Sequence, residues 1–226
     1  MALPLYLAQT PIEMAGNPLP GGLAYMACHF SPGGMGLSNL PKKLPSGAIL
    51  ILDDSTPMDG HDPEQILKEL SVENWASILL DFQRPGIPGQ REFAQQIAMA
   101  LPCPVGVSEL YARELSCPVF LPPVPPDKPL AEYLVPWQSR EIWLEAALDG
   151  ITLTLTEDGC SAAALLDFPG DGLAEERLHC HYSVKTGDHS IVFHLWRTRD
   201  DLTNLLAEAE ALGVTKAIGL WKELHG

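Results

Sequence analysis

The chain has 226 residues, of which 46% are hydrophobic and 19% are charged, so it can bury a core as one large domain or two small ones. Its formal net charge is -15, and no more than two Lys or Arg residues are adjacent. Phosphate backbones and anionic lipid surfaces would therefore repel most of its surface, which argues against nucleic acid and anionic membranes as partners.

The N-terminal segment lacks the basic stretch and the long apolar stretch of a secretion signal, and no later apolar run reaches the roughly 18 residues of a spanning helix. The five cysteines are an odd number and lie far apart, which favours free thiols in a reducing compartment. We therefore expect a soluble, unexported, cytoplasmic protein. The sequence does not indicate its oligomeric state.

Two groups of residues suggest a metal site. The segment from His179 to His181 contains two histidines and a cysteine, but in a strand the histidines point to one face and the cysteine to the other, so the three cannot chelate together. Asp53, Asp54 and Asp81 could hold a divalent cation through oxygen ligands, but no spacing singles out a metal. No Gly-rich phosphate loop opens a helix, and we expect neither a metal nor a cofactor.

Short runs rich in Ile, Leu and Val alternate with capped helical segments, which is typical of βα units around a parallel sheet. Eight of these runs are candidate core strands: Pro4 to Ala8, Leu23 to His29, Ala48 to Asp53, Ala76 to Asp81, Pro104 to Ser108, Pro118 to Leu121, Glu141 to Ala147 and Lys216 to Trp221. The pattern predicts a compact (β/α)8 TIM-type barrel that occupies residues 1–226 as a single domain.

Helix starts are marked by capping residues. Thr10 and Asp62 each precede a proline and a Glu or Gln, which is the order of a capped first turn. We expect Asp127 and Thr198 to cap two further helices. The chain ends five residues after Trp221, which leaves no room for an eighth helix.

The region from residue 148 to 189 interrupts the βα pattern. Asp-Gly and Gly-Asp pairs separate segments of alternating polarity such as Ile151 to Thr156, which indicates antiparallel hairpins. An edge meander is one interpretation. We favour a β-rich insertion after the seventh strand, from which the segment His189 to Trp196 returns to the barrel.

In a closed parallel barrel the C-terminal ends of the strands share one rim, where function is expected. Several carboxylates at one rim raise one another's pKa values, which suits acid and base chemistry, although each could also be a solvated loop start or a helix cap. The candidate catalytic residues are Asp54, Asp81, Glu109 and Glu145. The candidate ligand-binding residues are Tyr25, His29, Asp53, Gln83, Arg84, Trp221 and Glu223.

The segment from Trp75 to Pro85 is the most informative part of the chain, because an apolar run ends in a carboxylate, an aromatic, an amide and a guanidinium. It resembles the strand-four motif of the family 18 glycosidases, the chitinases and chitinase-like lectins, which reads Asp-x-x-Asp-x-Asp-x-Glu. The last aspartate of the motif matches Asp81. The first two aspartates are replaced by Ala76 and Leu79, and the glutamate is replaced by Gln83.

The resemblance implies a barrel with its site at the fourth strand and a tryptophan, here Trp221, under a bound sugar. In that family the glutamate protonates the leaving oxygen while the aspartate orients the acetamido group of the substrate. Glutamine cannot donate an acidic proton. The resemblance therefore implies a protein that binds a saccharide or similar polar ligand without hydrolysing it.

Two alternatives remain. The chain could be a glycoside hydrolase with relocated carboxylates, for which Glu109 and Glu145 would have to lie roughly 5 to 9 Å apart. It could also be a degenerate barrel that acts as an interaction or structural protein.

Overall fold

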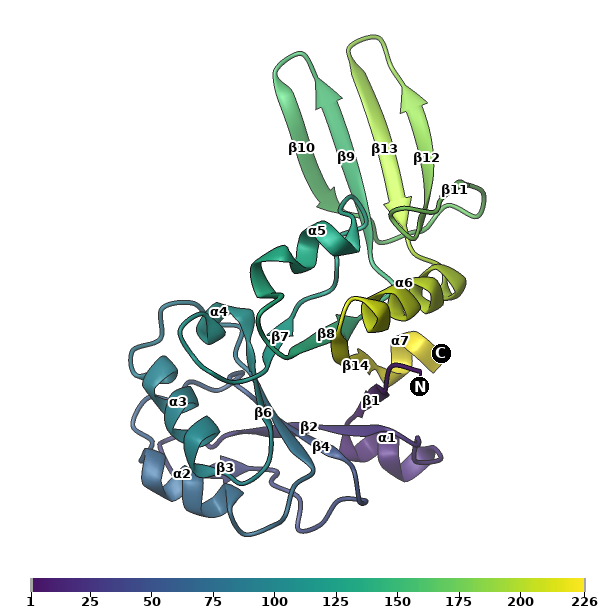
Figure 1. Ribbon diagram of the computed structural model, residues 1–226. Helices are drawn as coiled ribbons and strands as arrows, with labels where there is room; N and C mark the ends of the chain where they lie inside the picture. The colour runs from purple at the N-terminus through teal and green to yellow at the C-terminus, as the bar shows by residue number, and fades with distance from the viewer. Residues whose placement is uncertain (1, 226) are drawn as a thin grey trace.

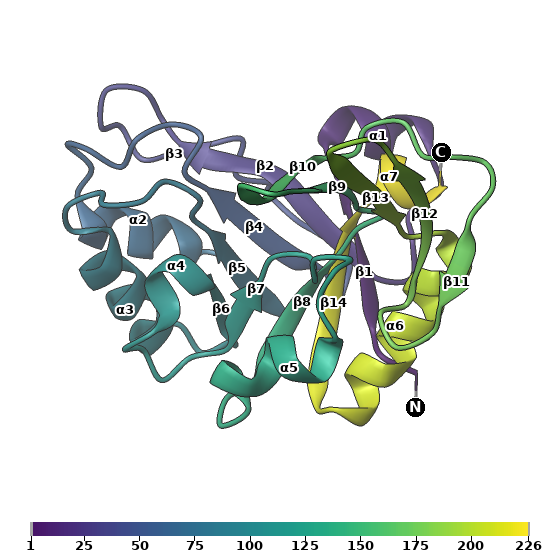
Figure 2. The same ribbon diagram turned by 90° about the horizontal axis from the view of Figure 1, so that it is seen from above.

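Eight parallel strands close into a barrel in the computed structural model, which describes residues 2–225 (Figures 1 and 2). The barrel strands are β1 (Leu5–Gln9), β2 (Leu23–Phe30), β4 (Ile49–Asp53), β5 (Ser77–Asp81), β6 (Val105–Ser108), β7 (Val119–Leu121), β8 (Ile142–Ala146) and β14 (Val214–Leu220). Strand β1 closes the ring because it pairs with both β14 and β2. A short strand, β3 (Leu37–Ser38), lies antiparallel to β2 outside the ring. The predicted TIM-type barrel is confirmed.

Helices connect most of the barrel strands. They are α1 (Pro11–Gly16), α2 (Pro63–Leu70), α3 (Gln90–Ala100), α4 (Glu109–Ala112), α5 (Leu130–Leu134) with the 3-10 turn η1 (Val135–Trp137), α6 (Arg199–Ala211) and α7 (Trp221–His225). The last of these is a five-residue turn in the place of a full eighth helix. None of the helices in residues 2–225 is both long and apolar enough to cross a bilayer.

Three of the four predicted caps are present. Thr10 and Thr198 each form a capping box with the residue three positions on, and the Asp62 carboxylate accepts a hydrogen bond of 3.0 Å from the Glu64 amide. The prediction for Asp127 is wrong, because α5 begins after Pro129, which has no side chain able to cap it.

The barrel strands alternate between a buried interior and a buried outer layer. On β4, Ile49 and Ile51 join the interior cluster, whereas the alternate residues Leu50 and Leu52 join the larger cluster beneath the helices. Trp143 on β8 fills the interior and approaches β6 so closely that a Cβ at Gly106 would lie 2.4 Å from its ring. Only glycine fits at that position, which explains the small residue in an otherwise branched strand.

Between β8 and α6 the chain forms a second, five-stranded sheet that projects from the barrel as a single layer (Figure 1). Its strands are β9 (Gly150–Thr156), β10 (Gly159–Ala164), β11 (Leu173–Glu175), β12 (Cys180–Thr186) and β13 (Ser190–Trp196). All pair antiparallel in the order β10-β9-β13-β12-β11. The predicted hairpins are therefore present after the seventh barrel strand, and the returning segment forms a central strand of this insertion sheet.

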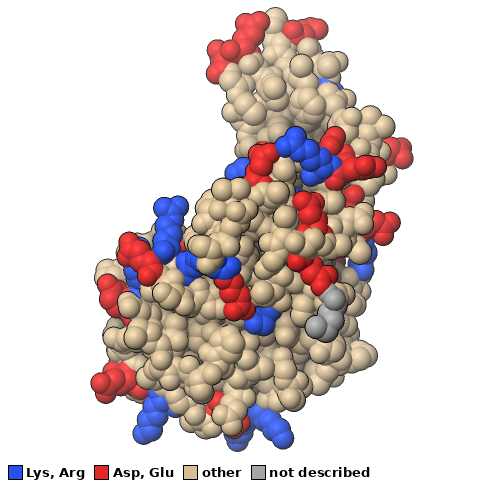
Figure 3. All heavy atoms as spheres, viewed as in Figure 1, with Lys and Arg blue, Asp and Glu red and all other residues tan. Residues whose placement is uncertain are grey.

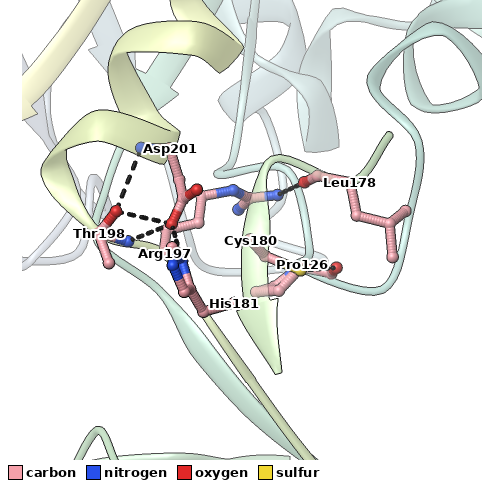
Figure 4. A network of polar contacts seen from close by, with 7 residues as sticks. All are labelled: Pro126, Leu178, Cys180, His181, Arg197, Thr198 and Asp201. Carbon is pink, nitrogen blue, oxygen red and sulfur yellow. Dashed lines mark hydrogen bonds and ion pairs between the residues drawn. The ribbon is translucent and has the colours of Figure 1, made fainter. Parts of the chain in front are cut away.

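Polar contacts attach the insertion sheet to the barrel (Figure 4). The buried Arg197 guanidinium donates hydrogen bonds to the carbonyls of Val124, Pro125 and Leu178. His181 lies 2.7 Å from the Asp201 carboxylate on α6, which also accepts hydrogen bonds from the Thr198 backbone and hydroxyl. The base of the sheet is thus tied to α6 and to the loop after β7.

The segment 179–181 is only partly a strand, because β12 begins at Cys180 and His179 lies before it with a φ of 47°. His179 lies 2.5 Å from Glu208, and the Cys180 thiol donates to the Pro126 carbonyl at 3.5 Å. Within residues 2–225 no three His, Cys, Asp or Glu side chains are placed to hold a metal ion, and all five cysteines are free thiols.

Candidate functional site

A small cavity of about 120 Å³ opens at the C-terminal end of the barrel. Three carboxylates line it, namely Asp53 at the end of β4, Asp81 at the end of β5 and Glu145 on β8. Most of the remaining lining is apolar and includes Met26 and Phe120. The parallel strands therefore bring three of the predicted rim acids together in one mouth.

Asp81 is held by two neighbouring side chains. The Gln83 amide donates to Oδ1 of Asp81 at 2.5 Å, and the Ser108 hydroxyl lies 3.4 Å from the same oxygen. Burial raises the pKa of Asp81 above its usual range, the charges of Asp53 and Asp54 add to the rise, and the two hydrogen bonds oppose it. Asp81 is thus a half-buried carboxylate whose protonation depends on its neighbours.

Glu145 carries the largest shift among the carboxylates of the mouth. Burial, followed by the negative charges of Asp81, Asp149 and Glu223, raises its pKa to about 7. Asp149 follows β8, and burial also raises its pKa, whereas the positive charge of Arg197 lowers it. Near neutral pH, Glu145 can therefore hold a proton beside Asp81.

Asp54 lies outside the cavity and organises the loop after β5. Its buried carboxylate accepts hydrogen bonds of 3.0 Å from the backbone amides of Gln83 and Arg84 and from the side-chain amide of Gln90. Asp53 rather than Asp54 faces the mouth, in the same alternation that turns Ile51 inward. Asp54, predicted as a catalytic residue, therefore holds the loop that carries Gln83 and Arg84 and does not line the cavity.

A second hollow of about 260 Å³ adjoins the first. Gln83, Ser108, Glu109 and Phe120 contribute to its lining, and Phe120 also lines the mouth. Glu109 begins α4 and so faces this hollow instead of the cavity with Asp81. The two hollows share Phe120, and the Ser108 hydroxyl of the second lies 3.4 Å from the Asp81 carboxylate of the first.

Tyr133 on α5 is an aromatic near the site that sequence reasoning missed. Its hydroxyl donates to the Pro122 carbonyl at 3.0 Å, beside the second hollow. Burial and the charges of Glu109 and Glu145 raise its pKa, which places it within electrostatic reach of both acids. Tyr133 lies within a helix and not at the end of a strand, so a search of the strand ends in the sequence does not find it.

The other predicted ligand-binding residues lie away from the two hollows. Tyr25 points to the outer layer, where its hydroxyl donates to the Asn39 carbonyl at 2.8 Å, and His29 is half-buried beside Asp53 without lining either hollow. The Arg84 guanidinium donates to the Ser55 carbonyl.

The C-terminal candidates also have other partners. Trp221 begins α7 instead of ending β14, packs against the outer layer and stacks on His225 with ring centroids 4.2 Å apart. Glu223 accepts a hydrogen bond from the Leu148 amide. Of the predicted ligand-binding residues, Asp53 lines the first hollow and Gln83 lines the second, and the other five line neither of the two.

No protein-family model and no curated protein matches the sequence. Among solved structures the fold is similar to that of the spore cortex-lytic enzyme SleL from Bacillus cereus, with a TM-score of 0.56 and 11% identity, over 96% of this chain and 70% of that one. It is also similar to a chitinase from Chromobacterium violaceum, with a TM-score of 0.56 and 10% identity, over 96% and 93% of the two chains. These likenesses show that the fold of this chain is that of the barrels in the two enzymes.

Proposed function

We propose that the mouth of the barrel binds a saccharide or a similar polar ligand without hydrolysing it. The contact between Gln83 and Asp81 carries the proposal. The side chain at position 83 is a neutral amide where the resembled motif has its acid, and this amide donates a hydrogen bond to Asp81. The amide retains a second N–H and its carbonyl oxygen for a ligand. The position therefore supports recognition and lacks a transferable proton.

The chemistry of the lining fits a sugar. Carboxylates accept hydrogen bonds from hydroxyl groups, and the apolar surface offered by Phe120 and Met26 suits the C–H face of a sugar ring. Because Asp53, Asp81 and Glu145 converge, the mouth favours neutral or amine-bearing sugars over acidic ones. The adjoining hollow at Glu109 offers room for a second sugar unit.

Titration calorimetry with neutral oligosaccharides, chosen from a glycan array, tests this proposal. We expect Asp81→Ala to abolish detectable binding and Gln83→Ala to weaken it about 10-fold or more, since each removes hydrogen bonds from a half-buried site. Asp167→Ala, in an exposed loop of the insertion sheet, is the matched control and should bind as the unaltered protein does. Unchanged binding by both mouth variants would refute the proposal.

One observation favours a second candidate, a glycoside hydrolase with relocated carboxylates. Glu145, with a pKa of about 7, has the protonation behaviour of a general acid, and Asp81 in the same cavity could act as the partner carboxylate. Turnover of chromogenic glycosides that Glu145→Gln abolishes and Asp167→Asn leaves intact would support it. An absence of turnover with every glycoside that binds would leave only the binding function.

A further inference from the structure

One face of the insertion sheet is mainly apolar over its four long strands. In an antiparallel sheet, residues that pair across neighbouring strands lie on the same face. Every second residue of β9, beginning with Ile151, lies on the apolar face, together with its partners on the neighbouring strands. We define the apolar face by ten residues: Ile151, Leu153, Leu155, Cys160, Ala162, Tyr182, Val184, Ile191, Phe193 and Leu195. The same register places Ala164, Leu173, Thr186 and Glu175 at the ends and at the β11 edge of this face. The opposite face carries Thr, Ser, His and Lys side chains, such as Thr154, Ser183 and Lys185.

The apolar face is uncovered toward the tip of the sheet. Leu155, Val184 and Ile191 are 39%, 44% and 41% exposed, and only Leu195 at the base is buried. None of the ten residues belongs to either hydrophobic cluster of the barrel. A sheet with one apolar face is normally buried against a second layer, and residues 2–225 supply no such layer here.

The charge distribution permits a second copy of this chain as the partner. The chain as a whole carries a net charge of -15, so two copies repel each other wherever acidic surfaces meet. None of the ten residues of the apolar face is ionised, and Glu175 on β11 lies at its edge. Figure 3 shows acidic side chains at the tips of the insertion and others beside its base, with a largely uncharged surface between them. Two copies can therefore approach through this face without bringing like charges together.

The flat area of the face comes close to that of a standard interface. Four long strands spaced about 4.8 Å apart, each about 23 Å long, give a flat footprint of roughly 440 Å² for each copy. Two copies together bury roughly 900 Å² when each face is treated as flat, and the uneven surface of the side chains adds to this area. Stable interfaces typically bury about 1,200 to 2,000 Å². A twofold axis presents the same face on both sides, so apolar meets apolar by symmetry.

We propose that two copies of this chain associate by packing the apolar faces of their insertion sheets against each other, forming an intermolecular β-sandwich. The two sheets pack about 10 Å apart with their strands rotated by roughly 30°, as in sandwiches within one chain. The barrels lie at the two outer ends of this dimer. The mouths of both barrels keep their own complete set of residues.

Sedimentation equilibrium of the full chain over a range of concentrations tests the proposal. We expect a mass of twice the 24.6 kDa of one chain, and Leu155→Glu should weaken the dimer by about 100-fold or more, because the twofold axis buries the new charge twice. The matched control is Thr154→Glu, which adds the same charge to the opposite face one residue away. It should remain dimeric.

A second pair of variants keeps the test valid if Leu155→Glu does not fold. Val184→Glu on β12 should give a monomer, and Ser183→Glu should stay dimeric, with thermal unfolding confirming that each variant is folded. A monomer at every concentration of the unaltered protein would overturn the proposal. So would dimers that survive both apolar-face substitutions, or dimers that either control disrupts equally.

Discussion

The side-chain amide of Gln83 and the carboxylate of Asp81 are joined by a hydrogen bond of 2.5 Å at the mouth of the barrel. This bond fixes the orientation of the amide and makes Asp81 the acceptor of the pair. A carboxylic acid at position 83 would have to share a proton with Asp81, so the identity of this residue determines the protonation of the mouth.

We expect Gln83→Glu to raise the pKa of Asp81 further. The substitution removes a hydrogen bond that stabilises the charged form and adds a negative charge beside it. Carbon-detected NMR titration of the Asp and Glu carboxyl groups measures the change. Gln95→Glu on the exposed side of α3 is the control and should leave the Asp81 titration in place, and an unchanged or lower value in Gln83→Glu would contradict the expectation.

Glu145 should make the protein less stable as the pH rises. Its pKa is raised from an ordinary 4.5 to about 7, so between these values the unfolded chain releases a proton that the folded chain retains. The free energy of unfolding therefore falls from about pH 4.5 to about pH 7 and then levels off. After allowance for its partial exposure, the total loss should be about 1 to 2 kcal/mol.

Urea unfolding at several pH values, with Glu145→Gln for comparison, isolates this contribution. The neutral variant should gain stability relative to the unaltered protein as the pH rises. Asp158→Asn, at the exposed tip of β9 and β10, is the control for the loss of one surface carboxylate and should follow the stability curve of the unaltered protein. Parallel stability curves for Glu145→Gln and the unaltered protein would rule out a buried, protonated Glu145.

Asp54→Asn should loosen the loop that presents Gln83. The amide can accept through only one of its two atoms, so at least one of the three donors loses its partner, at a cost of about 1 to 3 kcal/mol. Hydrogen exchange at the Gln83 and Arg84 amides should accelerate. Asp53→Asn is the control, since Oδ1 of Asp53 accepts only from the Ser55 amide, and equal protection in both variants would contradict the positioning role.

Thr198→Ala should destabilise the junction of the insertion sheet and α6. The substitution removes the capping hydroxyl, whose partner Asp201 also contacts His181, and should cost about 1 kcal/mol. Thr203→Ala, within the same helix, should be neutral or slightly stabilising because alanine is the better helix former. Thermal unfolding of the two variants should therefore shift in opposite directions or by clearly different amounts.

Much of the barrel could be predicted because apolar runs and capping residues are local signals. Runs such as Ala48 to Asp53 correspond to strands with small errors at their ends. The cap at Asp127 could not be predicted correctly, because Pro129 delays the start of α5. The sequence predicts Trp221 at the end of a strand. In the structure α7 begins at this residue, and its ring packs against the outer layer.

The sequence could predict a site residue only where its place at the end of a strand decides whether its side chain reaches the rim of the barrel. Asp81 and Glu145 were expected at the rim, and both line the mouth. The sequence could not tell which of Asp53 and Asp54 faces inward, since that depends on the strand's orientation in the closed ring. Tyr133 could not be anticipated, because it reaches the acids from a separate helix through tertiary packing.

The pairing of Leu5 with Ala217 joins the two ends of the described chain within one barrel. During synthesis β1 emerges first, but its second neighbour, β14, emerges only after the insertion sheet and α6 have been made. Contacts of such long sequence separation form slowly because the loop between them must first be ordered. Closure of the barrel, and with it the assembly of the acidic mouth, is therefore expected to be a late step of folding that no N-terminal fragment can complete.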